Sequence, residues 1–156
     1  MQSNILLISI RPKYATKIFY ENTKNVELRR VRTRLQSGDL VLVYVSYPEK
    51  ALLGSFEVER VIVENLPKSL NKLWNQVENK AGIKRKEFDR YYEGASVGVG
   101  IFFNQVKIFP QRLELERLRK QLPNLRPPQS YRYMTDGELE KVNSLVQCKA
   151  ATIPEN

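Results

Sequence analysis

Three charged residues within six positions, Lys24, Glu27 and Arg29, have the types and spacing that could do chemistry. Glu27 and Arg29 alternate with Val26 and Leu28, so in a strand the charged side chains share one face and the apolar ones share the other. Facing a phosphate, Lys24 would act as a point charge and Arg29 as a planar fork. If the protein is an enzyme, Lys24 and Glu27 are its catalytic candidates.

Two roles are open to Glu27. The side chain could accept a proton, or it could read the amino group of a base. It could instead pair with Lys24 or Arg29 and hold their side chains in place. We favour the pairing role, because structural ion-pair networks perturb pKa values in the same way as active sites do.

Other side chains extend this candidate site. Arg11 and Lys13, at the entrance of a predicted helix, could hold a phosphate or could be plain surface charges. Tyr47 and Tyr131 could stack on an unpaired base, although tyrosines pack into cores more often, and loop position favours Tyr131 over Tyr44. The full predicted ligand-binding set contains no metal ligand and consists of Arg11, Lys13, Lys24, Glu27, Arg29, Arg30, Tyr47, Ser130 and Tyr131.

The charge of the chain is concentrated around these residues. The net charge is +9, and residues 11–34 hold eight basic and two acidic side chains, a net +6. Such a patch attracts polyanions and makes their binding sensitive to salt. We expect Arg30, Arg32 and Arg34 to form a rim that attracts without selecting. On charge alone, a solvated surface that keeps the protein soluble explains the patch equally well.

Several kinds of chemistry are excluded by what the sequence lacks. It contains no histidine, which removes the usual general base, the commonest metal ligand and all Ser-His-Asp or Cys-His catalysis. It contains no phosphate-binding or dinucleotide-binding glycine motif, so ATP and NAD are not expected as ligands. The single cysteine, Cys148, can form no internal disulfide and is interpreted as an inert thiol.

The elements that must position the candidate site mix strands and helices. Apolar and alternating runs predict strands at 5–10, 26–31, 40–45 and 51–63, and a hairpin of 96–103 with 106–109 around Asn104-Gln105. The run 40–45 is apolar on both faces, as in a central strand. Helical spacing predicts helices at 12–20, 67–80, 84–93 and 115–122, and a last one behind a Thr135–Glu138 capping box that ends near Gln147. We expect the aromatic residues of the middle helices to be core: Trp74, Phe88, Tyr91 and Tyr92.

The order of these elements agrees with a motif. The segment from Asn22 to Arg29 resembles the ASCH signature Gly-x-Lys-x-x-Glu-x-Arg, with Asn22 in place of the glycine. Its flanks agree: a strand and a helix led by Ser9–Ala15 before it, Gly38-Asp39 and an apolar strand after it, and a late loop 127–133. The chain is therefore similar to ASCH-type predicted transcriptional regulators. This resemblance implies an α+β fold, a PUA-like mixed β-barrel surrounded by helices, in a superfamily that binds RNA, modified bases or nucleotides.

Several functions remain open under this resemblance. The simplest is a module that binds nucleic acid, RNA in the first place, or a modified nucleobase or nucleotide, in a regulatory setting. Some ASCH proteins are metal-dependent ribonucleases, and a shorter branch hydrolyses N4-acetylcytidine with a Lys, a Thr three residues later and a distant Glu. Here Glu27 occupies the Thr position and Glu78 is a loose candidate for the third residue. A domain that binds an acidic protein is the remaining alternative.

Length and composition bound the organisation of the chain. Its 156 residues suit one domain, placed at 1–148, with a flexible tail at 149–156. No stretch has the apolar length of a membrane span, and the N-terminus lacks the features of a secretory signal. We expect a soluble, cytoplasmic monomer without a membrane partner. No cofactor is expected, apart from a divalent metal if the protein is a ribonuclease.

Overall fold

The computed structural model describes residues 3–128 and 130–151, with side chains up to Val146. Its strands are β1 (Ile5–Ile10), β2 (Val26–Arg29), β3 (Leu40–Val45), β4 (Ala51–Asn65), β5 (Val97–Glu114) and β6 (Tyr131–Tyr133). Its helices are α1 (Pro12–Phe19), α2 (Leu70–Val77), α3 (Arg85–Tyr92), α4 (Leu115–Gln121) and α5 (Asp136–Ala151). The fold class is α+β, as predicted.

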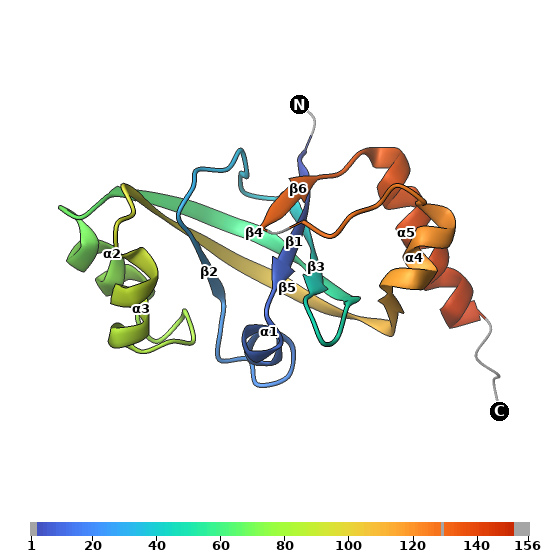
Figure 1. Ribbon diagram of the computed structural model, residues 1–156, viewed down its shortest axis with the longest axis horizontal. Helices are drawn as coiled ribbons and strands as arrows, with labels where there is room; N and C mark the ends of the chain where they lie inside the picture. Colours follow the sequence, from blue (N-terminus) through green and yellow to red (C-terminus); the bar gives the residue numbers. More distant parts are fainter. Residues whose placement is uncertain (1–2, 129, 152–156) are drawn as a thin grey trace.

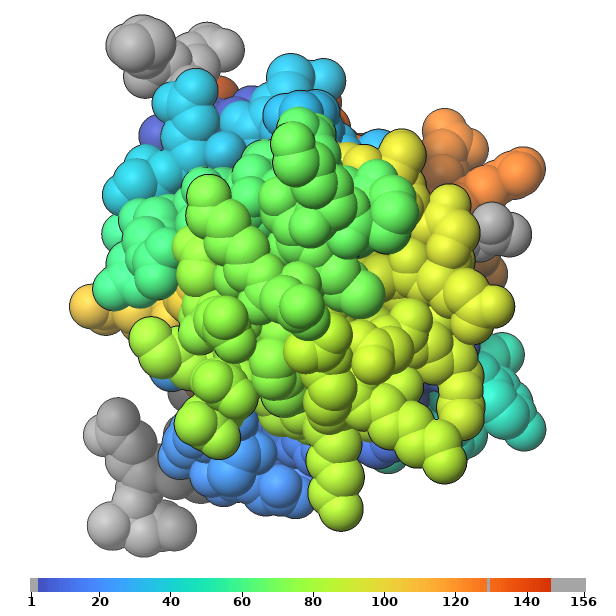
Figure 2. Space-filling view, turned by 90° about the vertical axis from the view of Figure 1, so that its left-hand side faces the viewer, coloured from blue at the N-terminus to red at the C-terminus, as the bar shows by residue number. Residues whose placement is uncertain are grey.

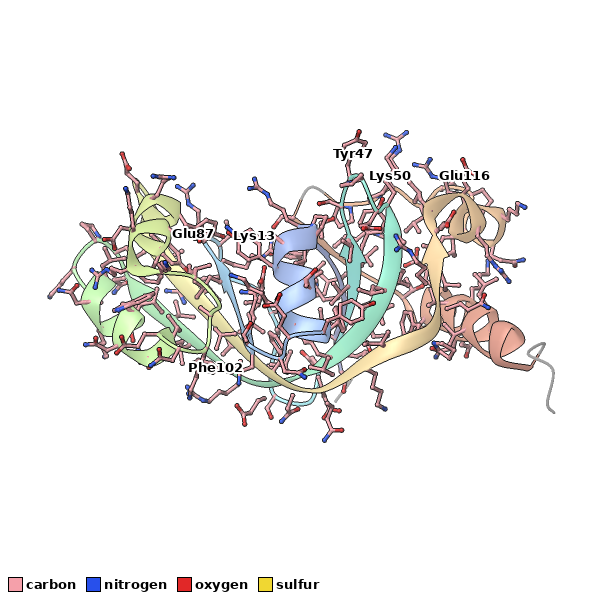
Figure 3. All side chains as sticks on the ribbon, turned by 90° about the horizontal axis from the view of Figure 1, so that it is seen from below. Lys13, Tyr47, Lys50, Glu87, Phe102 and Glu116 are labelled. Atoms are coloured by element: carbon pink, nitrogen blue, oxygen red, sulfur yellow. The ribbon has the colours of Figure 1, made fainter. Side chains whose placement is uncertain are left out.

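The six strands form one curled sheet, a half-barrel, in the order β2-β5-β4-β3-β1-β6. The long pair β4 and β5 runs along the whole molecule, with α2 and α3 at one end and α4 and α5 at the other (Figure 1). Helix α1 lies in the curl of the sheet (Figure 3), where its buried residues Ala15, Ile18 and Phe19 join the main apolar cluster. The interior strand β3 confirms the prediction made from its two apolar faces.

The hairpin predicted around Asn104-Gln105 is wrong, because β5 continues through both residues. A two-residue hairpin turn of type I′ needs positive φ at both residues, and of these two only Gln105 (φ 52°) has it. The register with β4 shifts here, so that Lys107 pairs with Ser55 while Asn104 pairs with Glu57. One extra residue in β5 is therefore accommodated as a bulge, and the strand runs on.

Side chains close the gap between the two edges of the half-barrel, and we call this closure the seam. Arg29 of edge strand β2 donates from Nη1 to Ser130 Oγ at 2.9 Å. The Tyr131 hydroxyl donates to the carbonyl oxygen of Arg32 at 3.2 Å. Ser130 and Tyr131 were predicted in a loop, but Tyr131 begins strand β6, which pairs antiparallel with β1.

The remaining boundaries differ slightly from prediction. Strand β2 ends at Arg29, and α2 begins at Leu70, behind a turn. The capping box is confirmed: the Thr135 amide donates to Glu138 Oε1 at 3.0 Å and the Glu138 amide to Thr135 Oγ1 at 3.1 Å.

Helix α5 continues to Ala151, past Gln147; residues 152–156 of the predicted tail and the Cys148 side chain lie outside the described part. Within that part, no helix is long and apolar enough to cross a membrane.

Candidate functional site

A cavity of about 560 Å³ opens between α1, β2, the start of α3 and the β3–β4 connection. Its lining includes the predicted residues Arg11, Lys24, Glu27, Arg29 and Tyr47. Figure 3 shows the mouth: Lys13 and Glu87 lie on one side of α1, and Tyr47 and Lys50 lie on the other. We refer to this space as the cavity.

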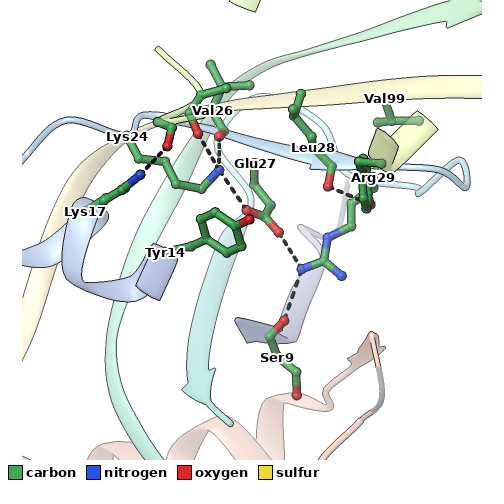
Figure 4. A network of polar contacts seen from close by, with 12 residues as sticks. Ser9, Tyr14, Lys17, Lys24, Val26, Glu27, Leu28, Arg29 and Val99 are labelled. Carbon is green, nitrogen blue, oxygen red and sulfur yellow. Dashed lines mark hydrogen bonds and ion pairs between the residues drawn. The ribbon is translucent and has the colours of Figure 1, made fainter. Parts of the chain in front are cut away.

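Glu27 forms the floor of the cavity between two cations (Figure 4). Its Oε1 lies 3.3 Å from Lys24 Nζ and its Oε2 lies 2.5 Å from Arg29 Nη2. The Lys24 ammonium also donates to the carbonyl oxygens of Val26 at 2.7 Å and Ala81 at 3.1 Å. With these three partners the ammonium has no proton left for a ligand.

The local sequence explains how Glu27 and Arg29 reach the cavity. Asn22 adopts a positive φ of 58°, which turns the chain from α1 into β2 where the family signature has glycine. From there the strand alternates. Val26 and Leu28 pack with Phe102 in an apolar cluster, and the charged pair points the other way.

The environment of Glu27 favours its charged form. Burial by itself would raise the pKa of this carboxyl group, but the Arg29 guanidinium and the Lys24 ammonium outweigh burial and hold the pKa below its ordinary value. Both carboxylate oxygens are engaged by cations. The geometry therefore agrees with the pairing role of Glu27 and is poorly suited to proton transfer by this carboxylate.

Tyr14 and Glu87 form a second polar pair in the cavity wall that sequence analysis missed. The Tyr14 hydroxyl donates to Glu87 Oε2, and Lys13 Nζ lies 3.4 Å from the same oxygen. Burial, followed by the bond to Glu87, raises the pKa of Tyr14 to about 12. Tyr14 lies next to the buried Ala15 on α1. From its position in the sequence, Tyr14 could not be distinguished from an aromatic residue of the core.

The mouth of the cavity combines an exposed aromatic ring with free cations. The Tyr47 side chain is 77% exposed, and Lys50 Nζ lies 5.8 Å from the centre of its ring. Arg11 is exposed on the facing side. Tyr44 and Tyr91 also line the cavity; Tyr91 was predicted to be core but is 37% exposed, and its hydroxyl donates to the carbonyl oxygen of Leu28.

The other predicted residues lie outside the cavity. Lys13 forms an ion pair with Glu87, which lines the cavity. Ser130 accepts a hydrogen bond from Arg29, which also lines it. Tyr131 packs edge-on against Tyr133 in the seam, so it is Tyr44, not Tyr131, that lines the cavity. Arg30 and Glu78 also lie away from the cavity. The guanidinium of Arg30 donates to the carbonyl oxygen of Glu93 at 3.3 Å, and Glu78 is the exposed C-cap residue of α2.

The described residues contain no group of three or more acidic or cysteine side chains that could hold a metal ion. The carboxylates nearest to the cavity floor are Glu27 and Glu87, and each already has a cationic partner.

The curled sheet and its basic cavity place the chain among α+β proteins of the PUA-like class. A family model described as the ASCH domain matches residues 8–116, so the chain belongs to the ASCH domain family. This confirms the family resemblance found in the segment from Asn22 to Arg29.

Two named relatives match the sequence. Over 89 residues the chain is 34% identical to large ribosomal subunit protein uL22 of Ureaplasma parvum serovar 3, a match that covers 57% of this chain and 27% of that protein. The chain thus spans about a quarter of that relative's length. Over 140 residues it is 25% identical to the ASCH domain-containing ribonuclease of Zymomonas mobilis, covering 89% of this chain and 90% of that one.

Solved structures share the fold. The crystal structure of ASCH from Zymomonas mobilis has a TM-score of 0.81 at 23% identity, covering 90% of this chain and 94% of that one. Human THYN1, solved in complex with DNA containing 5-methylcytosine, has a TM-score of 0.57 at 16% identity, covering 93% and 98%. At these identities the likeness extends to the fold alone.

Proposed function

We propose that the protein binds nucleic acid, RNA in the first place, or a nucleotide, by holding one unpaired base in the cavity. The observation that carries this proposal is the arrangement of the cavity, in which a fixed polar floor is surrounded by tyrosines and opens through a cationic mouth. Its volume of about 560 Å³ lies within the range of about 300–1,000 Å³ that small-molecule sites have.

The walls suit a planar, polar ligand. Tyr14 and Tyr91 offer aromatic surface inside, and Tyr47 offers an exposed ring at the mouth. Base stacking on such rings contributes about 1–3 kcal/mol per base. A base inside a duplex cannot reach a pocket of this kind without leaving the stack, so single strands are the preferred ligand.

The phosphate of this ligand would lie at the mouth. Lys24 and Arg29 are engaged by Glu27, so their role in this proposal is to shape the floor. Arg11 and Lys50 are exposed at the mouth of the cavity and are free of ion pairs among the described residues.

The comparisons support the same class of ligand. One relative is named a ribonuclease and one structural neighbour was solved with DNA that carries a modified base. The match to uL22 adds a relative that is named as a protein of the large ribosomal subunit.

Replacing Tyr47 with alanine tests the proposal. Because Tyr47 is 77% exposed, its loss leaves the fold intact but removes the ring at the mouth. We expect Tyr47→Ala to weaken binding of a single-stranded RNA by about 1–3 kcal/mol, measured by fluorescence anisotropy. The matched control is Tyr20→Ala: Tyr20 is 60% exposed and lies outside the cavity. Equal affinities for both variants would contradict the cavity as the binding site.

RNA cleavage is the second candidate, favoured by the relative named a ribonuclease, which aligns with nearly the whole chain. If cleavage takes place here, Lys24 and Glu27 would hold Arg29 toward the scissile phosphate instead of moving a proton. Incubation of labelled RNA with the protein, with and without divalent metal, tests this candidate. Intact RNA under both conditions would leave binding as the function.

A further inference from the structure

A second depression, here called the groove, adjoins the cavity between α1 and the helices α2 and α3. Its volume is about 820 Å³, and it shares Ile83 and Glu87 with the cavity lining. The ion pair between Lys13 and Glu87 forms the lip between the two spaces. In Figure 2 the green to yellow atoms of α2, α3 and the neighbouring chain cover this end of the molecule, and the blue N-terminal part of the chain lies below them.

The charged residues that line the groove are mostly cations. They are Lys13, Lys17, Lys84 and Arg85, against the acidic Glu21 and Glu87. Two of these cations have no ion pair among the described residues: Lys17, whose Nζ donates to the carbonyl oxygen of Gly82 at 2.5 Å, and Lys84, which is exposed. Arg85 is bound to Asp89 at 2.7 Å, which offsets its charge.

The only tryptophan of the chain, Trp74, lines the same groove. Its ring is partly exposed, and the Arg85 guanidinium lies 5.7 Å from the ring centre. An indole in a groove that also holds cations is the combination on which single strands stack while their phosphates are neutralised.

We propose that the groove holds the nucleotides next to the one in the cavity, so that the ligand is a single-stranded oligonucleotide that crosses the Lys13–Glu87 lip. This inference rests on the proposed function and deepens it. Lys17 and Lys84 contact the flanking phosphates, and Trp74 contacts a flanking base. A mononucleotide fills the cavity alone.

The test compares a uridine mononucleotide with a uridine hexanucleotide on the full chain. We expect Lys17→Ala/Lys84→Ala to weaken hexanucleotide binding about three- to tenfold and to leave mononucleotide binding unchanged. The slope of log affinity against log salt, which is negative, should become shallower by about 1.4 for the hexanucleotide. The matched control is Lys107→Ala/Lys141→Ala, in which both lysines are exposed and outside both spaces.

The tryptophan supplies a second readout. The fluorescence of Trp74 should change when the hexanucleotide binds and stay constant when the mononucleotide binds. If the double variant is poorly folded, Lys84→Ala alone must still lower hexanucleotide affinity, because Lys84 is exposed and holds no ion pair among the described residues.

Three outcomes would overturn the inference. If the mononucleotide binds and the hexanucleotide binds no tighter, with unchanged Trp74 fluorescence, the groove is not used although the cavity function stands. If neither ligand binds, the proposed function fails as well. If polyglutamate of equal charge binds as tightly as the hexanucleotide and loses affinity equally in Lys84→Ala, the groove serves acidic protein.

Discussion

At the scale of single residues, the geometry of Glu27 distinguishes a residue that supports the cavity floor from one that contacts a ligand. A carboxylate buried between two cations is stabilised by them and stabilises them in turn, and removing one partner leaves uncompensated charge in the interior. Lys24 is 5% exposed and Glu27 is 7% exposed. Water therefore does not solvate the charge that remains when one of the two is removed. The motif Lys-x-x-Glu-x-Arg is thus first a device that fixes the cavity floor.

Replacing Glu27 with glutamine should therefore destabilise the fold at neutral pH. We expect Glu27→Gln to lower the free energy of unfolding by about 3–5 kcal/mol at pH 7, measured by urea denaturation, because Lys24 and Arg29 stay buried without their counter-charge. The exposed Glu59→Gln should change it by less than about 0.5 kcal/mol.

The same network predicts a pH dependence. Because the folded-state pKa of Glu27 lies below its ordinary value of 4.5, its stabilising contribution is present above that pH and is lost as the pH falls through the folded-state pKa. The difference in unfolding free energy between wild type and Glu27→Gln should accordingly shrink between pH 5 and about pH 3. A difference that stays constant over this range would contradict a charged network.

Sequence reasoning at this scale succeeded where a residue lies on a simple pattern. The alternation of Val26, Glu27, Leu28 and Arg29 predicted both the core face and the polar face of β2. It could not find Tyr14 and Glu87, whose side chains meet across 73 positions of sequence. Contacts of this length depend on how α1 and α3 pack, and no local spacing encodes that packing.

At the scale of elements, the long pair β4 and β5 has to bend for the sheet to curl around α1. Its register shifts at three places, between Leu52 and Gly54, between Ser55 and Glu57, and between Val58 and Arg60. Gly54 of β4 lies close to both β5 and α1. A Cβ atom there would overlap the Lys107 carbonyl oxygen and lie 2.8 Å from Phe19 Cε1.

We expect Gly54→Ala to destabilise the protein by at least about 1–3 kcal/mol in thermal or urea unfolding, since a backbone atom blocks the added methyl group. The control is Gly137→Ala in α5, where the nearest atom to an added Cβ lies 3.9 Å away. That change should be neutral or stabilising by up to about 1 kcal/mol. A neutral Gly54→Ala would show that the bend tolerates a side chain.

The errors in the predicted elements come from pairing between strands that are distant in the sequence. Asn104-Gln105 has the composition of a weak turn, and only the pairing of β5 with β4 shows that the chain runs straight on. Strand β6 has three residues and gains its strand geometry from pairing with β1, which lies more than a hundred positions earlier. The boundaries of β1 and β3, by contrast, follow from their continuous apolar runs and were predicted to the residue.

At the scale of the whole molecule, the chain has a net charge of +9 and carries two adjoining spaces that open to solvent. Four cations in them are free of ion pairs among the described residues: Arg11, Lys17, Lys50 and Lys84. A single-stranded ligand that neutralises its phosphates with all four should bind with a slope of log affinity against log salt of about −3. Titration of the hexanucleotide between 50 and 300 mM salt measures this slope. A slope near zero would show that charge plays no part in binding.

The charge pattern of the sequence predicted the basic segment and its division into a site and a rim of Arg30, Arg32 and Arg34, but not which cations would line the two spaces. Residues 11–34 supply Arg11 and Lys17 to the two spaces, whereas Arg32 and Arg34 belong to the seam, where Arg34 lies 3.9 Å from the Tyr133 ring centre. Lys50 and Lys84 lie outside the segment and were not predicted as ligand contacts. Which charges gather in space is decided by the curl of the sheet.

The most direct test of the cavity as the binding site is an NMR titration of the isotope-labelled protein with a uridine or cytidine mononucleotide. The amide signals that shift most should belong to residues around the cavity, with Ser9, Arg29 and Tyr47 among them, while those of α5 stay in place. Shifts confined to another surface, or no saturable shifts at millimolar nucleotide, would contradict the account.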